Sequence, residues 1–226
     1  MLTLVLTRHG LTPRSDPEQH LGQRIDIELS PAGQAQAVAL AVRLEHVRFE
    51  QIYTSPLVRA RETASVIAQR SPGRPAITVD PRLREMDYGH WEGLTYRQID
   101  ARDLAERQAW EADPARIPCP GGESGDDVAA RVSSFLVELL AAHDRRVGDA
   151  DFEERPVLVV AHSSLNRILV CVALGIAIRE YRLRLQQSQA NLTALRFEHG
   201  SGPSDARLIL LNDLAHLRRP PKTPWE

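Results

Sequence analysis

Two histidines directly follow short apolar segments of the kind that form buried strands. His9 follows residues 2–7 within Arg8-His9-Gly10, and His162 follows residues 157–161 within His162-Ser163-Ser164. Ligands of open α/β sheets bind beyond the carboxyl ends of the strands, so both histidines stand where a site is expected. A single histidine is usually a core or surface side chain, but the arginine and glycine beside His9 suit the close approach of a backbone to an anion. We therefore expect an anion site at this end of the sheet.

The elements that must position these histidines can be read from the apolar pattern. Strands are predicted at 2–7, 52–54, 77–79 and 157–161, with helices beginning at Ser30-Pro31, at Ser55-Pro56, near 128 and after His162. The segments 192–197 and 208–211 flank a turn rich in glycine and proline, which predicts an antiparallel hairpin. Strands that alternate with helices and are apolar throughout indicate an α/β fold, with a mostly parallel central sheet covered by helices on both faces.

The composition limits the kind of partner the chain can have. Its 226 residues are 42% hydrophobic, which predicts a single domain, and the segment from about 218 to 226 is expected to be a flexible tail. A formal charge of -2 provides no overall basic field, so no nucleic-acid or membrane partner is expected. The start of the chain is not typical of a signal peptide or a membrane span, so we expect a cytoplasmic protein. Cys119 and Cys171 form no CxxC pair and are interpreted as core residues.

The order of these motifs resembles the histidine phosphatase superfamily, in its branch with phosphoglycerate mutases and small-molecule phosphatases. RHG alone would be a weak signal, but five segments occur in the family's order and at plausible spacing. They are RHGLT at 8–12, TSPLVRARET at 54–63, LREMDYGHWEG at 83–93, the region 120–132 around GES, and HSSLNR at 162–167, with a family-like LND at 211–213. The resemblance therefore covers nearly the whole chain, and it implies a phosphoglycerate mutase-like fold.

The resemblance implies a role for each matching residue. His9 would be the nucleophile that becomes phosphorylated, Arg8, Arg59 and His162 would surround the phosphoryl group, and Glu85 would donate the proton to the leaving oxygen. The chemistry is consistent with this set, because cationic donors stabilise the charge that a phosphoryl group spreads over its oxygens during transfer. The sequence contains no HExxH motif and no histidine-aspartate cluster at ligand spacing, so neither a metal nor a cofactor is expected.

Three positions depart from the family pattern. Leu11 replaces the usual glutamate or glutamine, so a polar contact is missing there. Ser15 replaces an asparagine that touches phosphate, and Ser163-Ser164 replace a glycine pair. We keep Ser15 and Ser163 as candidate phosphate-binding residues, since hydroxyl and N–H donors at a helix N-terminus suit an anion.

The preferred function is a phosphatase that hydrolyses small phosphomonoesters through a phosphohistidine and releases inorganic phosphate. A cofactor-dependent phosphoglycerate mutase is the first alternative, although the stretch from Glu85 to His162 is short for the mutase insertion. A catalytically silent phosphate-binding module is the second. The substrate stays open; regions 13–26 and 94–127 are expected to contact it, with Arg24, Arg97 and Arg102 as possible anion contacts or as plain surface arginines. A homodimer is possible.

Overall fold

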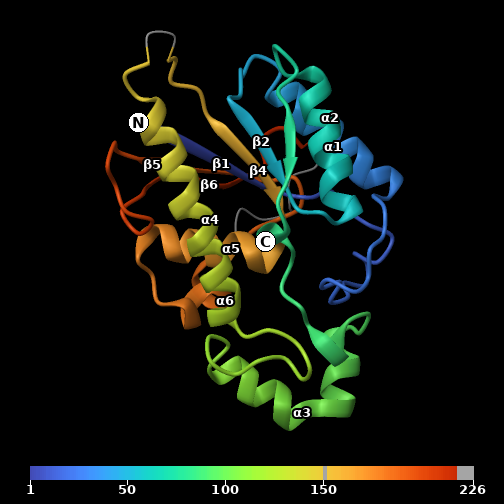
Figure 1. The fold of residues 1–226 in the computed structure, drawn as a ribbon. Helices are drawn as coiled ribbons and strands as arrows, with labels where there is room; N and C mark the ends of the chain where they lie inside the picture. Colours follow the sequence, from blue (N-terminus) through green and yellow to red (C-terminus); the bar gives the residue numbers. More distant parts are fainter. Residues whose placement is uncertain (150–151, 218–226) are drawn as a thin grey trace.

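The computed structural model describes residues 1–149 and 152–217, which contain one six-stranded sheet (Figure 1). The strand order is β3-β2-β4-β1-β5-β6. The strands are β1 (Leu2–Arg8), β2 (Gln51–Thr54), β3 (Ile77–Val79), β4 (Val157–Ala161), β5 (Leu192–Phe197) and β6 (Arg207–Asp213). β3, β2, β4 and β1 are parallel, whereas β5 runs antiparallel to β1 and β6 antiparallel to β5. The predicted mostly parallel sheet and the predicted C-terminal hairpin are both confirmed.

Helices cover both faces of the sheet. The α-helices are α1 (Pro31–Arg43), α2 (Val58–Arg70), α3 (Tyr96–Ala112), α4 (Gly125–Arg146), α5 (Ser163–Leu174) and α6 (Tyr181–Arg184). Two buried clusters explain the layers. α1 and α2 pack on the face to which Leu158 and Val160 of β4 belong, and α4 and α5 pack on the face of Val157 and Val159. Because β4 is buried on both faces, its sequence is apolar without alternation.

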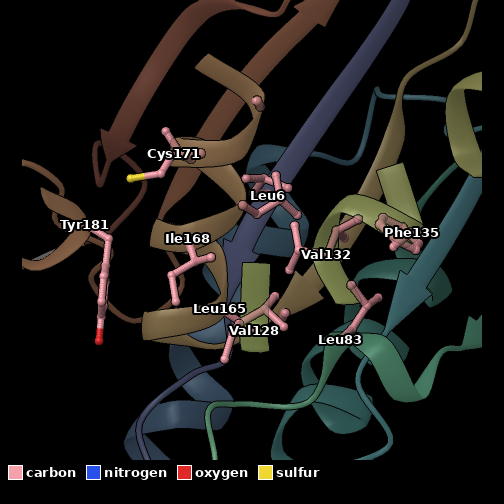
Figure 2. Close-up of a cluster of buried hydrophobic side chains, with 14 of the residues drawn as sticks. Leu6, Leu83, Val128, Val132, Phe135, Leu165, Ile168, Cys171 and Tyr181 are labelled. Carbon is pink, nitrogen blue, oxygen red and sulfur yellow. The ribbon is translucent and has the colours of Figure 1, made fainter. Parts of the chain in front are cut away.

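The second cluster forms the larger core (Figure 2). Leu6 of β1 packs with Val132 and Phe135 of α4 and with Ile168 of α5, which gives the amphipathic pattern near residue 128 its buried side. Cys119 and Cys171 are both buried free thiols, and both belong to this core as expected. No helix within 1–149 and 152–217 is long and apolar enough to cross a membrane.

The register of two neighbouring strands determines where the two histidines lie. Arg8 at the end of β1 pairs with Ala161 at the end of β4. The backbone N–H of His9 then donates a hydrogen bond of 3.0 Å to the carbonyl oxygen of Ala161. The two strands therefore end at the same level, and the residues that follow them, His9 and His162, are spatial neighbours.

The predicted helix starts are only partly correct. Ser30 caps α1 as predicted, because its Oγ accepts the N–H of Gly33. Ser55 does not cap α2, whose N-cap is Leu57; the Ser55 hydroxyl instead accepts the N–H of Leu57. The first N–H of α2, at Val58, donates to Asp26 at 2.7 Å. A cap supplied from a distant loop leaves no signal in the local sequence.

The sequence analysis did not predict α3. A capping box of Thr95 and Gln98 opens this helix, but only Ile99 and Trp110 of it are buried. The apolar stripe that reveals most helices is therefore nearly absent here, since the helix lies beyond the sheet (Figure 1). The predicted flexible tail, 218–226, lies outside the described residues.

Candidate active site

A cleft opens at the carboxyl ends of β1 and β4. It brings together six residues that the sequence analysis selected from four separate parts of the chain: Arg8, His9, Ser15, Arg59, Glu85 and Ser163. The seventh, His162, is fully buried beside His9, with the two ring centroids 5.2 Å apart. The predicted residues therefore converge on one place, as the position of the strand ends requires.

His9 is held in one orientation by the residue that follows it. Its Nδ1 lies 2.7 Å from the carbonyl oxygen of Gly10, which can only accept a hydrogen bond, so Nδ1 bears the proton. Burial, followed by the positive charges of Arg59 and Arg8, lowers the pKa of His9 well below its usual value. The ring is thus neutral near pH 7, with the lone pair on Nε2, which is the form that can act as a nucleophile.

His162 contributes two unpartnered nitrogens. It is fully buried, and neither Nδ1 nor Nε2 has a hydrogen-bond partner among the described residues. Burial, and then the charge of Arg59, lowers its pKa well below the usual value. A buried polar group without a partner costs stability, so such a group points to a ligand that completes its hydrogen bonds.

The two predicted arginines are held by different segments of the chain. Arg59 is fully buried, and its Nη1 and Nη2 donate to the carbonyls of Ile25 and Gly22 at 2.9 and 2.8 Å. Arg8 donates to the carbonyl of Gln187 at 3.2 Å and forms an ion pair of 3.1 Å with the exposed Glu18. The Nε groups of both arginines have no protein partner among the described residues. Each guanidinium is therefore fixed and retains an unused donor.

Glu85 is anchored on the start of α5. Its Oε1 accepts the backbone N–H groups of Met86 and Leu165 at 2.9 and 3.1 Å, and its Oε2 accepts that of Ser164 at 3.2 Å. The Ser164 hydroxyl bonds to Tyr88 Oη at 2.7 Å. We had expected Ser163-Ser164 to offer their N–H groups to phosphate. In the structure, the N–H groups of Ser164 and Leu165 hold the carboxylate instead, and Ser163 and Ser164 both line the cleft.

Position 10 needs a glycine for a steric reason that the sequence did not reveal. A Cβ atom on Gly10 would lie 2.4 Å from the carbonyl oxygen of Gly33, and one on Gly33 would lie 1.9 Å from that of Leu11. The loop after β1 therefore packs directly against the start of α1. The hydroxyl of Ser15 completes the turn, because it accepts the N–H of Thr12 at 3.0 Å.

Arg131 and Glu123 support the segment that leads to Glu85, and the sequence analysis missed Arg131. Arg131, from α4, donates to the carbonyls of Arg82, Arg84 and Glu85 and forms a 3.1 Å ion pair with Glu123. Glu123 belongs to the matched GES segment. Arg131 was missed because a single arginine on a long helix looks like a surface residue in sequence.

The arginines suggested for substrate contacts are not those of the cleft. Arg24 and Arg102 bond to Asp87 and Asp103 respectively, Arg97 is exposed, and none of the three lines the cleft. They fit the surface interpretation. The cleft instead contains Arg14, Arg167 and Arg182, together with Tyr96 and Trp110 of α3. Both regions expected to contact the substrate, 13–26 and 94–127, contribute residues to the cleft; the substrate contact itself stays a prediction.

Another cleft residue, His20, is enclosed by aromatic rings. It is 7% exposed and lies edge-on to Tyr88 and Tyr96, with centroids 4.7 and 4.6 Å away. Burial lowers its pKa to about 4. Across the described ranges, 1–149 and 152–217, no group of three or more His, Cys, Asp or Glu side chains could hold a metal ion.

Comparisons with known proteins agree with this geometry. Residues 4–208 match the model of the histidine phosphatase superfamily (branch 1). A glucosyl-3-phosphoglycerate phosphatase of Mycobacterium tuberculosis (strain ATCC 25618 / H37Rv) is 40% identical over 178 residues, which are 79% of this chain and 78% of that protein. Phosphoserine phosphatase 1 of Hydrogenobacter thermophilus is 29% identical over 181 residues, 80% of each chain.

Solved structures extend the likeness. The mycobacterial glucosyl-3-phosphoglycerate phosphatase in complex with inorganic phosphate has a TM-score of 0.78 and 37% identity, over 95% of this chain and 99% of that one. The protein thus belongs to the histidine phosphatase superfamily. The predicted enzyme class, a phosphatase of small phosphomonoesters, is confirmed at the level of these relatives.

Proposed function

We propose that this enzyme hydrolyses small phosphomonoesters through a phosphohistidine formed on Nε2 of His9. The observation that carries the proposal is the state of His9: Nδ1–H is bonded to Gly10, so a lone pair remains on Nε2 of a neutral ring that lines the cleft. Neutral imidazole is the nucleophilic form, and the low pKa keeps it available near pH 7.

The reaction proceeds in two displacements. Nε2 of His9 attacks phosphorus, the bond from phosphorus to the leaving oxygen breaks, and Glu85 gives that oxygen a proton to form the alcohol. Water then attacks the phosphohistidine, Glu85 takes a proton from the water, and the phosphorus-nitrogen bond breaks to release inorganic phosphate. Neutral His9 and protonated Glu85 are restored, so protons and charges balance over the cycle.

The remaining residues stabilise the phosphoryl group. Arg8 and Arg59 retain free Nε donors, and His162 has two unpartnered nitrogens. These groups offer hydrogen bonds to the equatorial oxygens, where negative charge accumulates in the transition state. Ser15 and Ser163 line the same cleft and add hydroxyl groups. The proposed reaction uses neither a metal nor an organic cofactor, because the fixed cations supply the charge stabilisation.

The substrates are small phosphorylated molecules. Relatives named for glucosyl-3-phosphoglycerate and for phosphoserine support this class for the present chain. Among the predicted partners, the small phosphorylated substrate and the inorganic phosphate product are retained here, whereas the homodimer stays a prediction.

The experiment is an assay of phosphate release in excess EDTA, with p-nitrophenyl phosphate and 3-phosphoglycerate as substrates. We expect full activity with the chelator. From 3-phosphoglycerate, free phosphate should form much faster than the isomer 2-phosphoglycerate. Activity that disappears in EDTA and returns with a divalent metal would contradict the metal-free reaction. Dominant isomerisation would favour the mutase alternative instead.

A further inference from the structure

Three arginines, Arg14, Arg167 and Arg182, line the cleft without a role in the phosphoryl transfer proposed above. The cleft contains five arginines, Arg8, Arg14, Arg59, Arg167 and Arg182, but only two carboxylates, Glu18 and Glu85. Glu18 pairs with Arg8, and backbone N–H groups hold Glu85. Arg8 and Arg59 already match the charge of one phosphoryl group. The cleft of a chain with net charge -2 therefore contains more positive charge than one phosphate can neutralise.

Arg167 of α5 is an unpaired cation in a half-buried position. No hydrogen bond or ion pair connects its guanidinium to a residue within the described ranges, and its buried Nε has no partner. Burial, with a further contribution from the charge of Arg8, lowers its pKa, yet a guanidinium stays protonated in proteins. Burying a charge without a partner costs stability, so this position has a cost that only an incoming anion would offset.

Arg182 and Trp110 contribute two more hydrogen-bond donors without a partner. Arg182, from α6, stacks on the indole ring of Trp110, from α3, at 4.0 Å from guanidinium carbon to ring centroid. Its Nη2 donates to Tyr96 Oη at 3.2 Å and lies 3.5 Å from Glu111, a carboxylate that Arg107 contacts at 2.7 Å. Arg182 Nη1 and Trp110 Nε1 have no partner among the described residues, and Trp110 is only 2% exposed.

Arg182 and Trp110 lie on α6 and α3, away from the phosphoryl position, whereas Arg167 of α5 is near enough to Arg8 for the charge of Arg8 to act on its guanidinium. The charges that depress the pKa of His9 are those of Arg59 and Arg8, whereas Arg182 acts on His20. Arg182 and Trp110 also come from the helices beyond the sheet, not from the strand ends (Figure 1). A ligand that pairs with the cations at both places therefore needs two anionic groups.

We propose that Arg167, Arg182 and Trp110 form a subsite for a carboxylate of the substrate, which makes the preferred substrate the phosphomonoester of a carboxylic acid. The inference rests on the proposed function for the phosphoryl end of the cleft. A guanidinium donates two parallel hydrogen bonds to a planar carboxylate. The indole N–H can only donate a hydrogen bond, so it also needs an acceptor oxygen. A neutral hydroxyl in the same place would leave the positive charge of Arg167 unpaired.

The test compares ligands that differ only in this group. The dissociation constants of 3-phosphoglycerate and glycerol 3-phosphate are measured by calorimetry on the His9→Asn protein, and again after adding Arg167→Met or Arg182→Met. We expect the acid to bind more tightly than its neutral counterpart, and each added substitution to reduce this preference by about 10- to 100-fold. Arg184→Met is the control, because Arg184 is 68% exposed and pairs with Glu180 on the surface; it should leave the preference unchanged.

Two further measurements separate the possible explanations. Arg167→Met should raise Tm by about 2–4 °C, because it removes an unpaired cation, and it should also weaken the binding of 3-phosphoglycerate. Substitution of a purely structural arginine would not have both effects. The phosphate alternative is tested with 1,3-propanediol bisphosphate against 3-hydroxypropyl phosphate, and a larger preference there than for the acid would overturn the carboxylate assignment. An unchanged acid preference in both variants would overturn the subsite. Turnover of p-nitrophenyl phosphate by the unsubstituted enzyme tests the proposed function separately.

Discussion

His9 and His162 lie edge-to-face, with ring centroids 5.2 Å apart and ring planes 62° from parallel. The arrangement follows from the pairing of Arg8 with Ala161, which ends two parallel strands at the same level. Both rings are neutral near pH 7, because burial and the neighbouring arginines lower their pKa values. In the proposed mechanism, the nucleophile His9 and the hydrogen-bond donor His162 thus stand side by side without mutual repulsion. Each prediction below depends on this pair or on the groups that surround it.

The acid role of Glu85 predicts a dependence on the leaving group. Glu85→Gln should slow the phosphorylation of His9 by alkyl phosphates by about 10²- to 10⁴-fold, and by p-nitrophenyl phosphate far less, because a phenolate leaves without a proton. The measurement is the rate of leaving-group release in a single turnover, since hydrolysis of the phosphoenzyme also uses Glu85 and is common to both substrates. Equal losses for both substrates in a folded variant would mean that Glu85 only positions the phosphate or its loop.

Arg131 predicts a loss of rate without a contact to substrate. Arg131→Met removes the donors to the carbonyls of Arg84 and Glu85, so the Glu85 carboxylate should lose its fixed position. We expect kcat to fall by about 10- to 100-fold with a smaller change in KM. Arg145→Met, at an exposed position on the same helix, is the matched control. A variant with unchanged kcat for an alkyl phosphate would show that α4 does not position the acid.

His20 predicts how stability depends on pH. Its pKa is about 4 in the folded protein and about 6.5 when unfolded, so between these values the unfolded chain binds a proton that the folded chain does not. Stability is therefore complete above pH 6.5 and declines as the pH falls, with His20 accounting for about 3 kcal/mol by pH 4. Denaturant unfolding of the unsubstituted protein and of His20→Gln, at several pH values, measures the difference. Parallel stability curves would contradict it.

The sequence was sufficient to predict the framework and most of the residues that converge on the cleft at the ends of β1 and β4. The continuous apolar segments predicted β1 and β4, and the matched motifs selected His9, Arg59 and Glu85, because these features are local in the chain. The rest depends on distant contacts. Asp26 caps α2, and α5 provides the N–H groups that hold Glu85. Neither relationship leaves a trace at the residue it supports.

The residues of the proposed carboxylate subsite could not be predicted from the sequence for a different reason. Arg167 and Arg182 look no different in sequence from Arg24, Arg97 and Arg102, because any of them could be a solvated surface arginine. Only the tertiary structure separates them: the first two enter the cleft, and the others are exposed or paired with carboxylates outside it. The helix that contributes Trp110 was missed as well, since so little of it is buried.

The central claim is that the phosphoryl group passes through Nε2 of His9, and trapping the phosphoenzyme tests it most directly. The enzyme is mixed with p-nitrophenyl phosphate, quenched within the first turnover under conditions that preserve phosphohistidine, and digested for mass spectrometry. We expect phosphate on the peptide that contains His9, a burst of p-nitrophenolate of about one equivalent if dephosphorylation limits turnover, and neither signal in His9→Asn. Phosphate on another residue, or undiminished turnover by folded His9→Asn, would contradict the proposed mechanism.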